Sequence, residues 1–180
     1  MRIIGGHHKG RRISPPVNLP VRPTTDLAKE SLFNILNNLI DFENLRVLDL
    51  FAGTGNISFE FASRQAALVT AIDLNFKCVE FIKKTAMQLD LTSIRAFRAD
   101  VFKLLGKSPT EPYDLIFSDA PYEMNEIKHL PDLIFEKKWL NKDGLLIIEH
   151  PRGIDFADHP QFSQNRHYGK VNFTFFTSEG

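Results

Sequence analysis

Residues 118–122 read Ser-Asp-Ala-Pro-Tyr and follow an apolar run, so a carboxylate, a proline and an aromatic ring share one turn. An exocyclic amine of a nucleic-acid base is a poor nucleophile, because its lone pair is delocalised into the ring. The carboxylate of Asp119 and a rigid backbone carbonyl can accept the two amine hydrogens and direct the lone pair toward a methyl donor. Pro121 stiffens the turn, and Tyr122 offers a face for an unstacked base. The turn therefore predicts base-amine methylation, with an ordinary proline turn and a surface tyrosine as the alternative.

A glycine-containing loop lies in the segment Val47-Leu-Asp-Leu-Phe-Ala-Gly-Thr-Gly55. Its glycines let the chain turn tightly and let a ligand approach the backbone where the next helix begins. A dinucleotide-binding loop uses the pattern G-x-G-x-x-G to seat a pyrophosphate on the following helix, but the position of the third glycine is Ser58 here. Asp49 would repel a pyrophosphate, whereas it can serve a ligand that carries an ammonium and a sulfonium. A plain strand-to-helix turn is the alternative interpretation of this loop.

Two further acids follow apolar runs. Asp73 ends the run after the glycine loop, and a carboxylate at that spacing can bind both ribose hydroxyls of an adenosine. It could equally cap a helix over residues 75–89. Asp100 follows the next run, where a side-chain acceptor can bind an adenine amino group while Val101 lines the ring. Capping of a short following helix is the alternative for Asp100.

The elements that would position these residues alternate between strands and helices. Apolar, strand-like runs cover residues 46–51, 67–73, 94–97, 113–118 and 144–149. Amphipathic stretches lie between them, near residues 56–64, 75–89 and 125–138. Unbroken apolar runs suit strands covered on both faces, so the alternation predicts a doubly wound parallel sheet. Residues 161–168 and 171–177 predict an antiparallel hairpin at the sheet edge, and the interval 151–160 is short for a crossover helix.

The first 22 residues differ from the rest of the chain. They carry five basic residues and no acid, whereas residues 23–180 carry 17 basic and 22 acidic residues. A basic arm on an acidic body favours a polyanionic partner such as nucleic acid, with a solvated basic terminus as the alternative.

After the arm, Thr24 or Thr25 can cap a helix. Residues recur there at helical spacing: Leu27, Ser31, Phe33, Ile35, Leu36 and Leu39.

Composition restricts the function classes further. With 43% hydrophobic and 24% charged residues, the 180-residue chain suits one core domain rather than a low-complexity or fibrous protein. It has no apolar run long enough for a membrane span and no signal-peptide pattern, so we expect no membrane partner. Its single cysteine, Cys78, cannot form an internal disulfide, which favours a reducing cytoplasm.

Several other chemistries lack their residue patterns. The sequence has no zinc motif, nucleophilic triad or P-loop, and His7 and His8 have no third metal ligand spaced nearby, so we expect no metal site. An NAD-dependent oxidoreductase would share the fold and Asp73, but it predicts no Asp-x-Pro-Tyr turn. A non-catalytic nucleic-acid-binding protein would explain the arm and leave the cofactor residues idle. A DNA adenine-N6 or protein-amide methyltransferase would use much the same turn.

Several segments together carry a family likeness: Met1–Gly6, Lys9–Arg12, Arg22–Leu36, Leu48–Gly55, Asp114–Phe117 and Asp119–Tyr122. Through them the chain resembles the bacterial 16S ribosomal RNA guanine-N2 methyltransferases of the RsmD type across nearly its whole length. Arg22–Leu36 is the most family-specific segment, because Gly-Thr-Gly loops occur in many methyltransferases. The turn of this family usually reads Asp-Pro-Pro-Tyr or Asp-Pro-Pro-Phe. Ala120 replaces its first proline here, which lowers the rigidity of the turn and keeps the carboxylate and the ring.

The resemblance implies a class I, Rossmann-like methyltransferase domain over residues 23–180, with a seven-stranded, mostly parallel sheet and an antiparallel C-terminal hairpin. It implies S-adenosylmethionine as the cofactor, bound by Asp49, Phe51, Gly53, Gly55, Asp73, Leu74, Asp100 and Val101. It implies catalysis by Asp119, Pro121 and Tyr122.

The substrate implied by the resemblance is the N2 amine of a guanine in 16S ribosomal RNA, within the small subunit or an assembly intermediate. We expect RNA contacts from the arm, residues 1–22, and its junction: Arg2, Lys9, Arg11, Arg12, Arg22 and Thr24. We expect a cytoplasmic monomer. Methylation of adenine N6 in DNA or RNA is the alternative reaction.

Overall fold

The computed structural model describes residues 1–17, 19 and 26–178. Its elements, in chain order, are α1 (Asp26–Leu36), β1 (Arg46–Leu50), α2 (Asn56–Ser63), β2 (Leu68–Asp73), α3 (Phe76–Gln88), β3 (Ile94–Arg98), α4 (Val101–Leu105), β4 (Tyr113–Asp119), a 3-10 helix η1 (Asn125–His129), α5 (Leu130–Glu136), β5 (Leu140–His150), β6 (Phe162–Tyr168) and β7 (Val171–Thr177). The expected alternation of strands and helices is confirmed, with shifted ends. The largest shift is in β5, which begins four residues before the predicted run, at Leu140.

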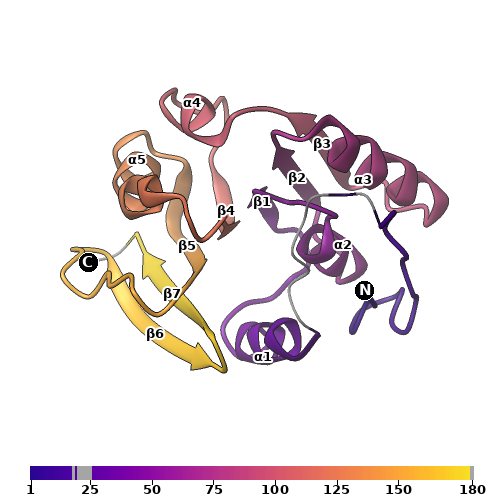
Figure 1. The fold of residues 1–180 in the computed structure, drawn as a ribbon, viewed down its shortest axis with the longest axis horizontal. Helices are drawn as coiled ribbons and strands as arrows, with labels where there is room; N and C mark the ends of the chain where they lie inside the picture. The colour runs from indigo at the N-terminus through magenta and orange to yellow at the C-terminus, as the bar shows by residue number, and fades with distance from the viewer. Residues whose placement is uncertain (18, 20–25, 179–180) are drawn as a thin grey trace.

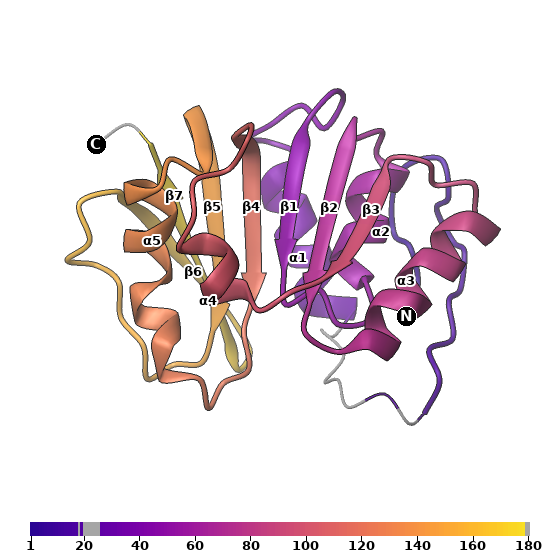
Figure 2. The ribbon, with the colours of Figure 1, turned by 90° about the horizontal axis from the view of Figure 1, so that it is seen from above.

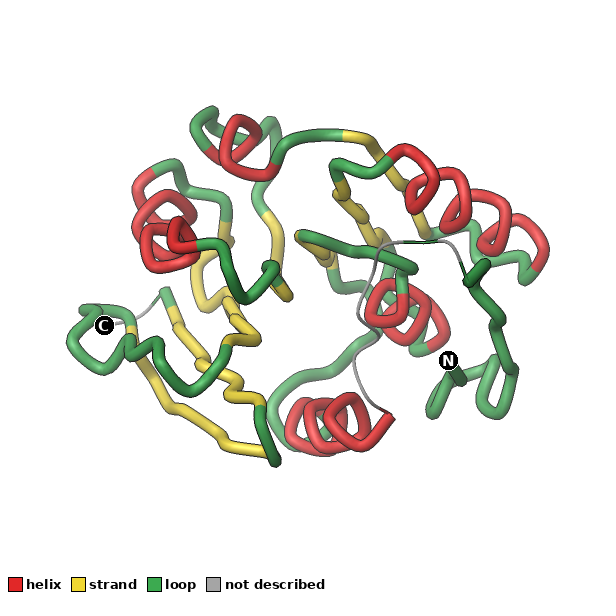
Figure 3. Tube along the Cα trace, viewed as in Figure 1, coloured by secondary structure: helices red, strands yellow, loops and turns green. Residues whose placement is uncertain are grey.

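The strands of the described chain form one sheet in the order β3-β2-β1-β4-β5-β7-β6 (Figure 1). The first five strands run parallel, while β7 is antiparallel to both of its neighbours, β5 and β6. The predicted doubly wound sheet with an antiparallel C-terminal hairpin is confirmed. Residues 151–161, which connect β5 to β6, contain no helix, as their small number suggested (Figure 3).

Helices cover both faces of the sheet (Figure 2). Helices α1, α2 and α3 pack on one face around Phe33, Phe59 and Phe61, and α4 and α5 pack on the other around Leu105 and Ile134. Neighbouring residues of one strand contribute to opposite cores, which explains the unbroken apolar runs in the sequence. The chain leaves β1 toward one face and β4 toward the other. The carboxyl ends of these two adjacent strands therefore form the switch point of the sheet, where folds of this kind bind ligands.

Helix α1 buries a different set of residues from the one that its spacing predicted. Leu27 and Leu39 are 73% and 51% exposed, and Leu39 lies beyond the end of the helix. Lys29 is fully buried instead. The expected capping residues, Thr24 and Thr25, lie outside the described residues. Within the described ranges, no helix combines the length and apolarity needed to cross a bilayer.

Candidate active site

Each of the five parallel strands has an acidic residue at or near its carboxyl end. These residues are Asp49 in β1, Asp73 in β2, Asp100 after β3, Asp119 in β4 and Glu149 in β5. Parallel strands present their carboxyl ends at one edge, so the fold gathers these acids along that edge (Figure 2). Among the described residues, no group of three or more His, Cys, Asp or Glu is arranged to hold a metal ion. Carboxylates gathered along one edge favour a positively charged ligand there.

The glycine loop between β1 and α2 has three residues in the left-handed region, Phe51, Gly53 and Gly55, with φ of 59°, 54° and 77°. Positive φ is an outlier for a bulky residue such as Phe51, and residues held this way cluster at ligand sites. At Gly55 a Cβ atom would lie 2.8 Å from Cγ1 of Ile82. Only glycine therefore lets α2 begin this close to α3.

Asp73 fastens this loop to the end of β2. Its Oδ2 accepts a hydrogen bond of 2.8 Å from the Gly53 N–H, and its Oδ1 accepts one of 2.7 Å from the Asn75 N–H. The N-cap of α3 is Asn75, whose side chain accepts from two amides of the first turn, so the capping alternative for Asp73 is wrong. Leu74, expected to contact the cofactor, is 61% exposed beside this carboxylate.

Asp49 is buried in β1, and its Oδ2 accepts a hydrogen bond of 2.5 Å from the Ser58 hydroxyl in α2. Burial raises the pKa of Asp49 to about 7, because the ionised form loses hydration. The Ser58 hydrogen bond opposes the rise, whereas the negative charges of Asp119 and Asp73 add to it. Asp49 thus lies in the field of the acids from both neighbouring strands.

Asp100 caps α4, since its side chain accepts a hydrogen bond of 3.0 Å from the Lys103 N–H. The capping alternative is therefore realised, and a ligand contact would have to use the remaining lone pairs of this carboxylate. Val101 packs in the core with 4% exposure, so it can reach a ligand only through its backbone. The adjacent Phe102 lies beside Phe51, with ring centroids 6.2 Å apart.

The turn after β4 combines a half-buried Asp119 with an exposed Pro121. Ala120 is 1% exposed, and its methyl group packs in the core beneath α4 and α5. The Tyr122 hydroxyl lies 3.4 Å from Oε1 of Glu149, which is the register partner of Asp119 in β5. Glu149 was not predicted as a site residue, although it is an acid at the end of an apolar run, as Asp73 is.

The basic arm is folded onto α2 as a short hairpin, closed by a bridge between Arg2 and Arg12. Ile3 and Ile13 are buried in the core, whereas Arg2, Lys9, Arg11 and Arg12 expose their side chains. Arg2 pairs with Glu30 at 3.3 Å. The other two residues expected to contact RNA, Arg22 and Thr24, lie outside the described residues.

A buried ion pair joins this arm to the site. Lys29 of α1 lies 3.4 Å from Oε2 of Glu60 and donates hydrogen bonds to Asn56 Oδ1 at 2.8 Å and to the Arg2 carbonyl. The same Glu60 oxygen accepts from the Ile4 N–H at 2.9 Å. Burial lowers the pKa of Lys29, and the negative charge of Glu60 opposes that change. No pattern in the sequence indicates this pairing, which fastens the arm to the helix that begins at the glycine loop.

The family model described as "Conserved hypothetical protein 95" matches residues 1–177. The chain belongs to this family. It is 37% identical to "Ribosomal RNA small subunit methyltransferase D" of Buchnera aphidicola subsp. Acyrthosiphon pisum (strain APS), covering 83% of this chain and 78% of that protein. It is 31% identical to the protein of the same name from Escherichia coli (strain K12), with 83% and 74% covered.

Among solved structures, "Putative methyltransferase yhhF from Escherichia coli" superposes with a TM-score of 0.85 at 26% identity. The superposition covers 98% of this chain and 97% of that one. The resemblance noted in the sequence is therefore confirmed for the family, and the predicted methyltransferase fold is confirmed with it.

Proposed function

We propose that the protein transfers a methyl group from S-adenosylmethionine to the N2 amine of a guanine in 16S ribosomal RNA. The observation that carries this proposal is the approach of two carboxylates from adjacent strands, Asp49 of β1 and Asp119 of β4. The strands pair in register through Leu50 and Ser118, and the charge of Asp119 raises the pKa of Asp49. One carboxylate lies in β1 just before the glycine loop and the other at the start of the amine-orienting turn, so donor and acceptor can meet between them.

The chemistry of the edge fits S-adenosylmethionine, which carries an ammonium and supplies an electrophilic methyl group on a sulfonium. Asp49 offers negative charge to that sulfonium and ammonium, whereas Asp119 offers its carboxylate to the amine that accepts the methyl group. Both oxygens of Asp73 already accept a backbone N–H, and each retains a lone pair that can accept a ribose hydroxyl. Leu74, exposed beside it, offers an apolar surface to the adenine ring.

The turn after β4 supports the reaction by orienting the amine. The Asp119 carboxylate and a backbone carbonyl of the turn accept its two hydrogens, which directs the nitrogen lone pair toward the methyl group. Pro121 limits the motion of that backbone. The Tyr122 ring holds the unstacked base, and its hydroxyl contact with Glu149 limits the orientations of the ring.

Ribosomal RNA of the small subunit is the substrate named for the relatives at 31% and 37% identity. The exposed basic side chains of the arm support the same substrate class, because lysine and arginine contacts to phosphate position RNA without reading its sequence. We propose a cytoplasmic monomer that acts on the small subunit or on an assembly intermediate.

Transfer of a labelled methyl group from S-adenosylmethionine tests this function. The acceptor is small-subunit particles from cells that lack the gene, compared with particles from cells that have it. The account predicts incorporation into the RNA of the first particles and little into the second, whose target is already methylated. Incorporation into ribosomal protein, or equal incorporation into both particle preparations, would contradict it.

A further inference from the structure

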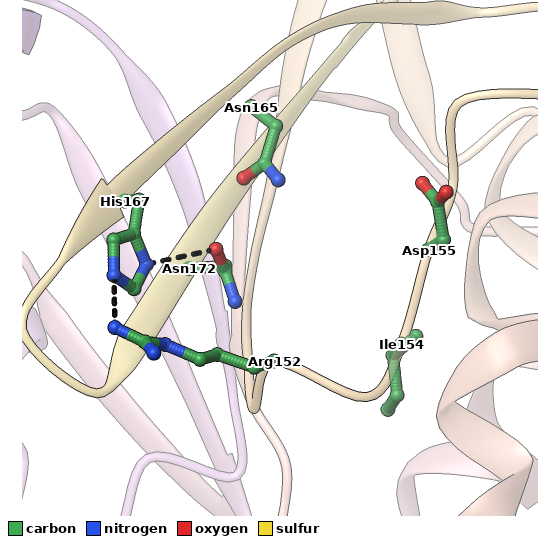
Figure 4. A pocket seen from close by; sticks show the side chains of 6 residues that line it. All are labelled: Arg152, Ile154, Asp155, Asn165, His167 and Asn172. Carbon is green, nitrogen blue, oxygen red and sulfur yellow. Dashed lines mark hydrogen bonds between the residues drawn. The ribbon is translucent and has the colours of Figure 1, made fainter.

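A polar pocket of about 560 Å³ opens between the C-terminal hairpin and the loop that follows β5. It is lined by Arg152, Ile154, Asp155, Asn165, His167 and Asn172. Figure 4 shows that the hairpin contributes Asn165, His167 and Asn172, that the loop contributes Arg152, Ile154 and Asp155, and that Arg152 extends across to His167. The volume lies within the range of small-ligand sites, about 300–1,000 Å³.

Hydrogen bonds fix which groups this pocket presents. Arg152 Nη2 lies 2.6 Å from Nε2 of His167 and donates to the Gly169 carbonyl at 2.9 Å. A guanidinium cannot accept a hydrogen bond, so Nε2 accepts and the imidazole proton resides on Nδ1. Nδ1–H then donates to Asn172 Oδ1 at 3.2 Å (Figure 4). The side-chain group that Asn172 has left for a ligand is its amide NH₂, a donor.

The loop after β5, which forms the other side of the pocket, is held in place by buried residues. His150, fully buried at the end of β5, places Nε2 at 2.7 Å from the Thr174 hydroxyl, and Phe156 of the loop packs edge-on against its ring at 5.1 Å. Asp155, next to Phe156, accepts a hydrogen bond of 3.0 Å from the Ala157 N–H. Both walls are thus held before a ligand arrives.

Strand register places the pocket two strands away from the catalytic turn and on the other face of the sheet, because His150, Asn172 and His167 point to the face covered by α4 and α5. The side chains of Asp119 and Glu149 point to the face covered by α1, α2 and α3. Asp119 pairs with Glu149, the next residue His150 pairs with Asn172, and Asn172 pairs with His167. Because neighbouring strands lie about 4.8 Å apart, Asn172 is roughly 10 Å from Asp119 along the carboxyl edge. The proposed cofactor residues occupy the β1–β3 half of that edge. The half beyond β4, which contains the pocket, is the part of that edge that the proposed cofactor residues leave open.

We propose that this pocket binds an unstacked base of the substrate RNA close to the methylated nucleotide, an inference that rests on the proposed function. The positive charge of Arg152 is offset by the negative charge of Asp155, so the pocket does not favour a phosphate. A guanidinium, a carboxylate and two amides instead offer the mixed donors and acceptors that the edges of RNA bases require. Ile154 supplies an apolar surface for the ring.

Asn165→Ala tests the pocket with little risk to folding, since this side chain is exposed and has no side-chain hydrogen-bond partner among the described residues. Asn165→Asp, of similar shape, replaces the amide donor by an acceptor. Arg166→Ala is the matched control: it is exposed on the same strand, points to the other face and bonds only Gln164 through its side chain in the described chain. Methylation is measured on naked small-subunit RNA and on assembled particles, with saturating cofactor.

Loss of one base contact should raise KM for RNA about tenfold in both Asn165 variants and leave kcat unchanged, on either substrate. Arg166→Ala should behave like the parent. If the parent is active and KM is unchanged in the Asn165 variants, the pocket does not bind a base of the substrate, and the proposed function is unaffected. An effect confined to assembled particles also contradicts base binding in the pocket, because it indicates contact with ribosomal protein. If the parent methylates neither substrate, the proposed function fails, and the affinity of each variant for naked RNA then tests base binding in the pocket. Weaker RNA binding by Asn165→Ala than by Arg166→Ala supports base binding there. Equal RNA binding by the two variants contradicts it.

Discussion

The Ser58 hydroxyl donates a hydrogen bond of 2.5 Å to Oδ2 of Asp49, and both side chains are buried. Ser58 stands where a dinucleotide-binding loop has its third glycine, a residue that allows close packing of helix on strand. Here the hydroxyl fixes a carboxylate that such a loop lacks. Ser58, which replaces the third glycine, and Asp49 inside β1 are therefore joined by this hydrogen bond into one unit. Its carboxylate suits a cationic ligand.

The pKa of Asp49, raised to about 7, predicts a pH-dependent affinity for S-adenosylmethionine. The cation favours ionised Asp49, so binding displaces a proton when the free protein holds one. Affinity should therefore fall as pH drops below about 7, by up to about tenfold per pH unit. Calorimetric titration between about pH 5.5 and 7.5 measures this, a range in which the amino group of the cofactor stays largely protonated.

Asp49→Asn is the control for that titration, because it keeps the shape and removes the ionisation. It should bind more weakly at pH 7.5 and lose the pH dependence. Ser58→Ala removes a hydrogen bond that lowers the Asp49 pKa, so the pH dependence should move to higher pH. An affinity of the parent that stays constant over the range, or that changes identically in Asp49→Asn, would exclude this role for Asp49.

Asp73→Ala should weaken binding of both S-adenosylmethionine and its demethylated product. The structure adds a second reason, because the substitution also removes the acceptor of the Gly53 N–H. Asp73→Asn separates the two effects: its amide oxygen can still accept one backbone hydrogen bond, but it offers one acceptor fewer to the ribose. Calorimetry with each variant measures the loss. Parent-like binding by Asp73→Ala would show that this carboxylate holds neither the loop nor the ribose.

Asp119→Ala should abolish methyl transfer and leave cofactor affinity nearly intact, because its partner is the target amine. Single-turnover transfer and calorimetry measure the two properties. Glu126→Ala, which removes an exposed acid close to the turn, is the charge-matched control. Asp119→Ala with the turnover of the parent would remove Asp119 from the mechanism.

Tyr122→Ala should reduce turnover by loss of base stacking worth about 1–3 kcal/mol. Tyr122→Phe keeps the ring and removes the hydroxyl, with its contact to Glu149. It should therefore retain most of the activity of the parent in a steady-state assay. If Tyr122→Phe were as impaired as Tyr122→Ala, the hydroxyl rather than the ring would be the important group.

The arm should give RNA binding its salt dependence. Neutralising Lys9, Arg11 and Arg12 together should reduce the slope of log affinity against log salt by about 2, if each contacts one phosphate. Arg12 should contribute more than Lys9. Met1, near Arg12 in the hairpin, contacts Thr54 of the glycine loop, whereas His8, near Lys9, contacts the Leu89 carbonyl beyond α3. Equal slopes for the triple variant and the parent would make the arm a solvated terminus.

The elements and the candidate residues of the site were predictable because their signals are local. Apolar runs gave the five parallel strands, and each acid at the end of a run reached the carboxyl edge once those strands paired. The family likeness carried the roles of Phe51 and Leu74, whose types alone indicate nothing. The start of β5 at Leu140 was not predictable, because the polar residues at 141–143 interrupt its apolar pattern.

The buried polar contacts were not predictable, because they join residues far apart in the chain. Lys29 is 31 positions from Glu60, and its place on α1 is typical of a solvated lysine, yet both side chains are buried together. The Tyr122–Glu149 contact likewise depends on the register of β4 against β5. Asp100 shows the converse: its local capping function was visible in the sequence, and only a ligand complex separates that function from adenine binding.

In the proposed mechanism, Asp119 orients a guanine N2 amine of small-subunit RNA for methylation. Mass analysis of nucleosides tests it most directly, using small-subunit RNA from cells that lack the gene after incubation with protein and S-adenosylmethionine. The account predicts one new N2-methylguanosine per RNA, formed by the parent and absent with Asp119→Ala. N6-methyladenosine in place of N2-methylguanosine, or N2-methylguanosine formed equally by the variant, would contradict it.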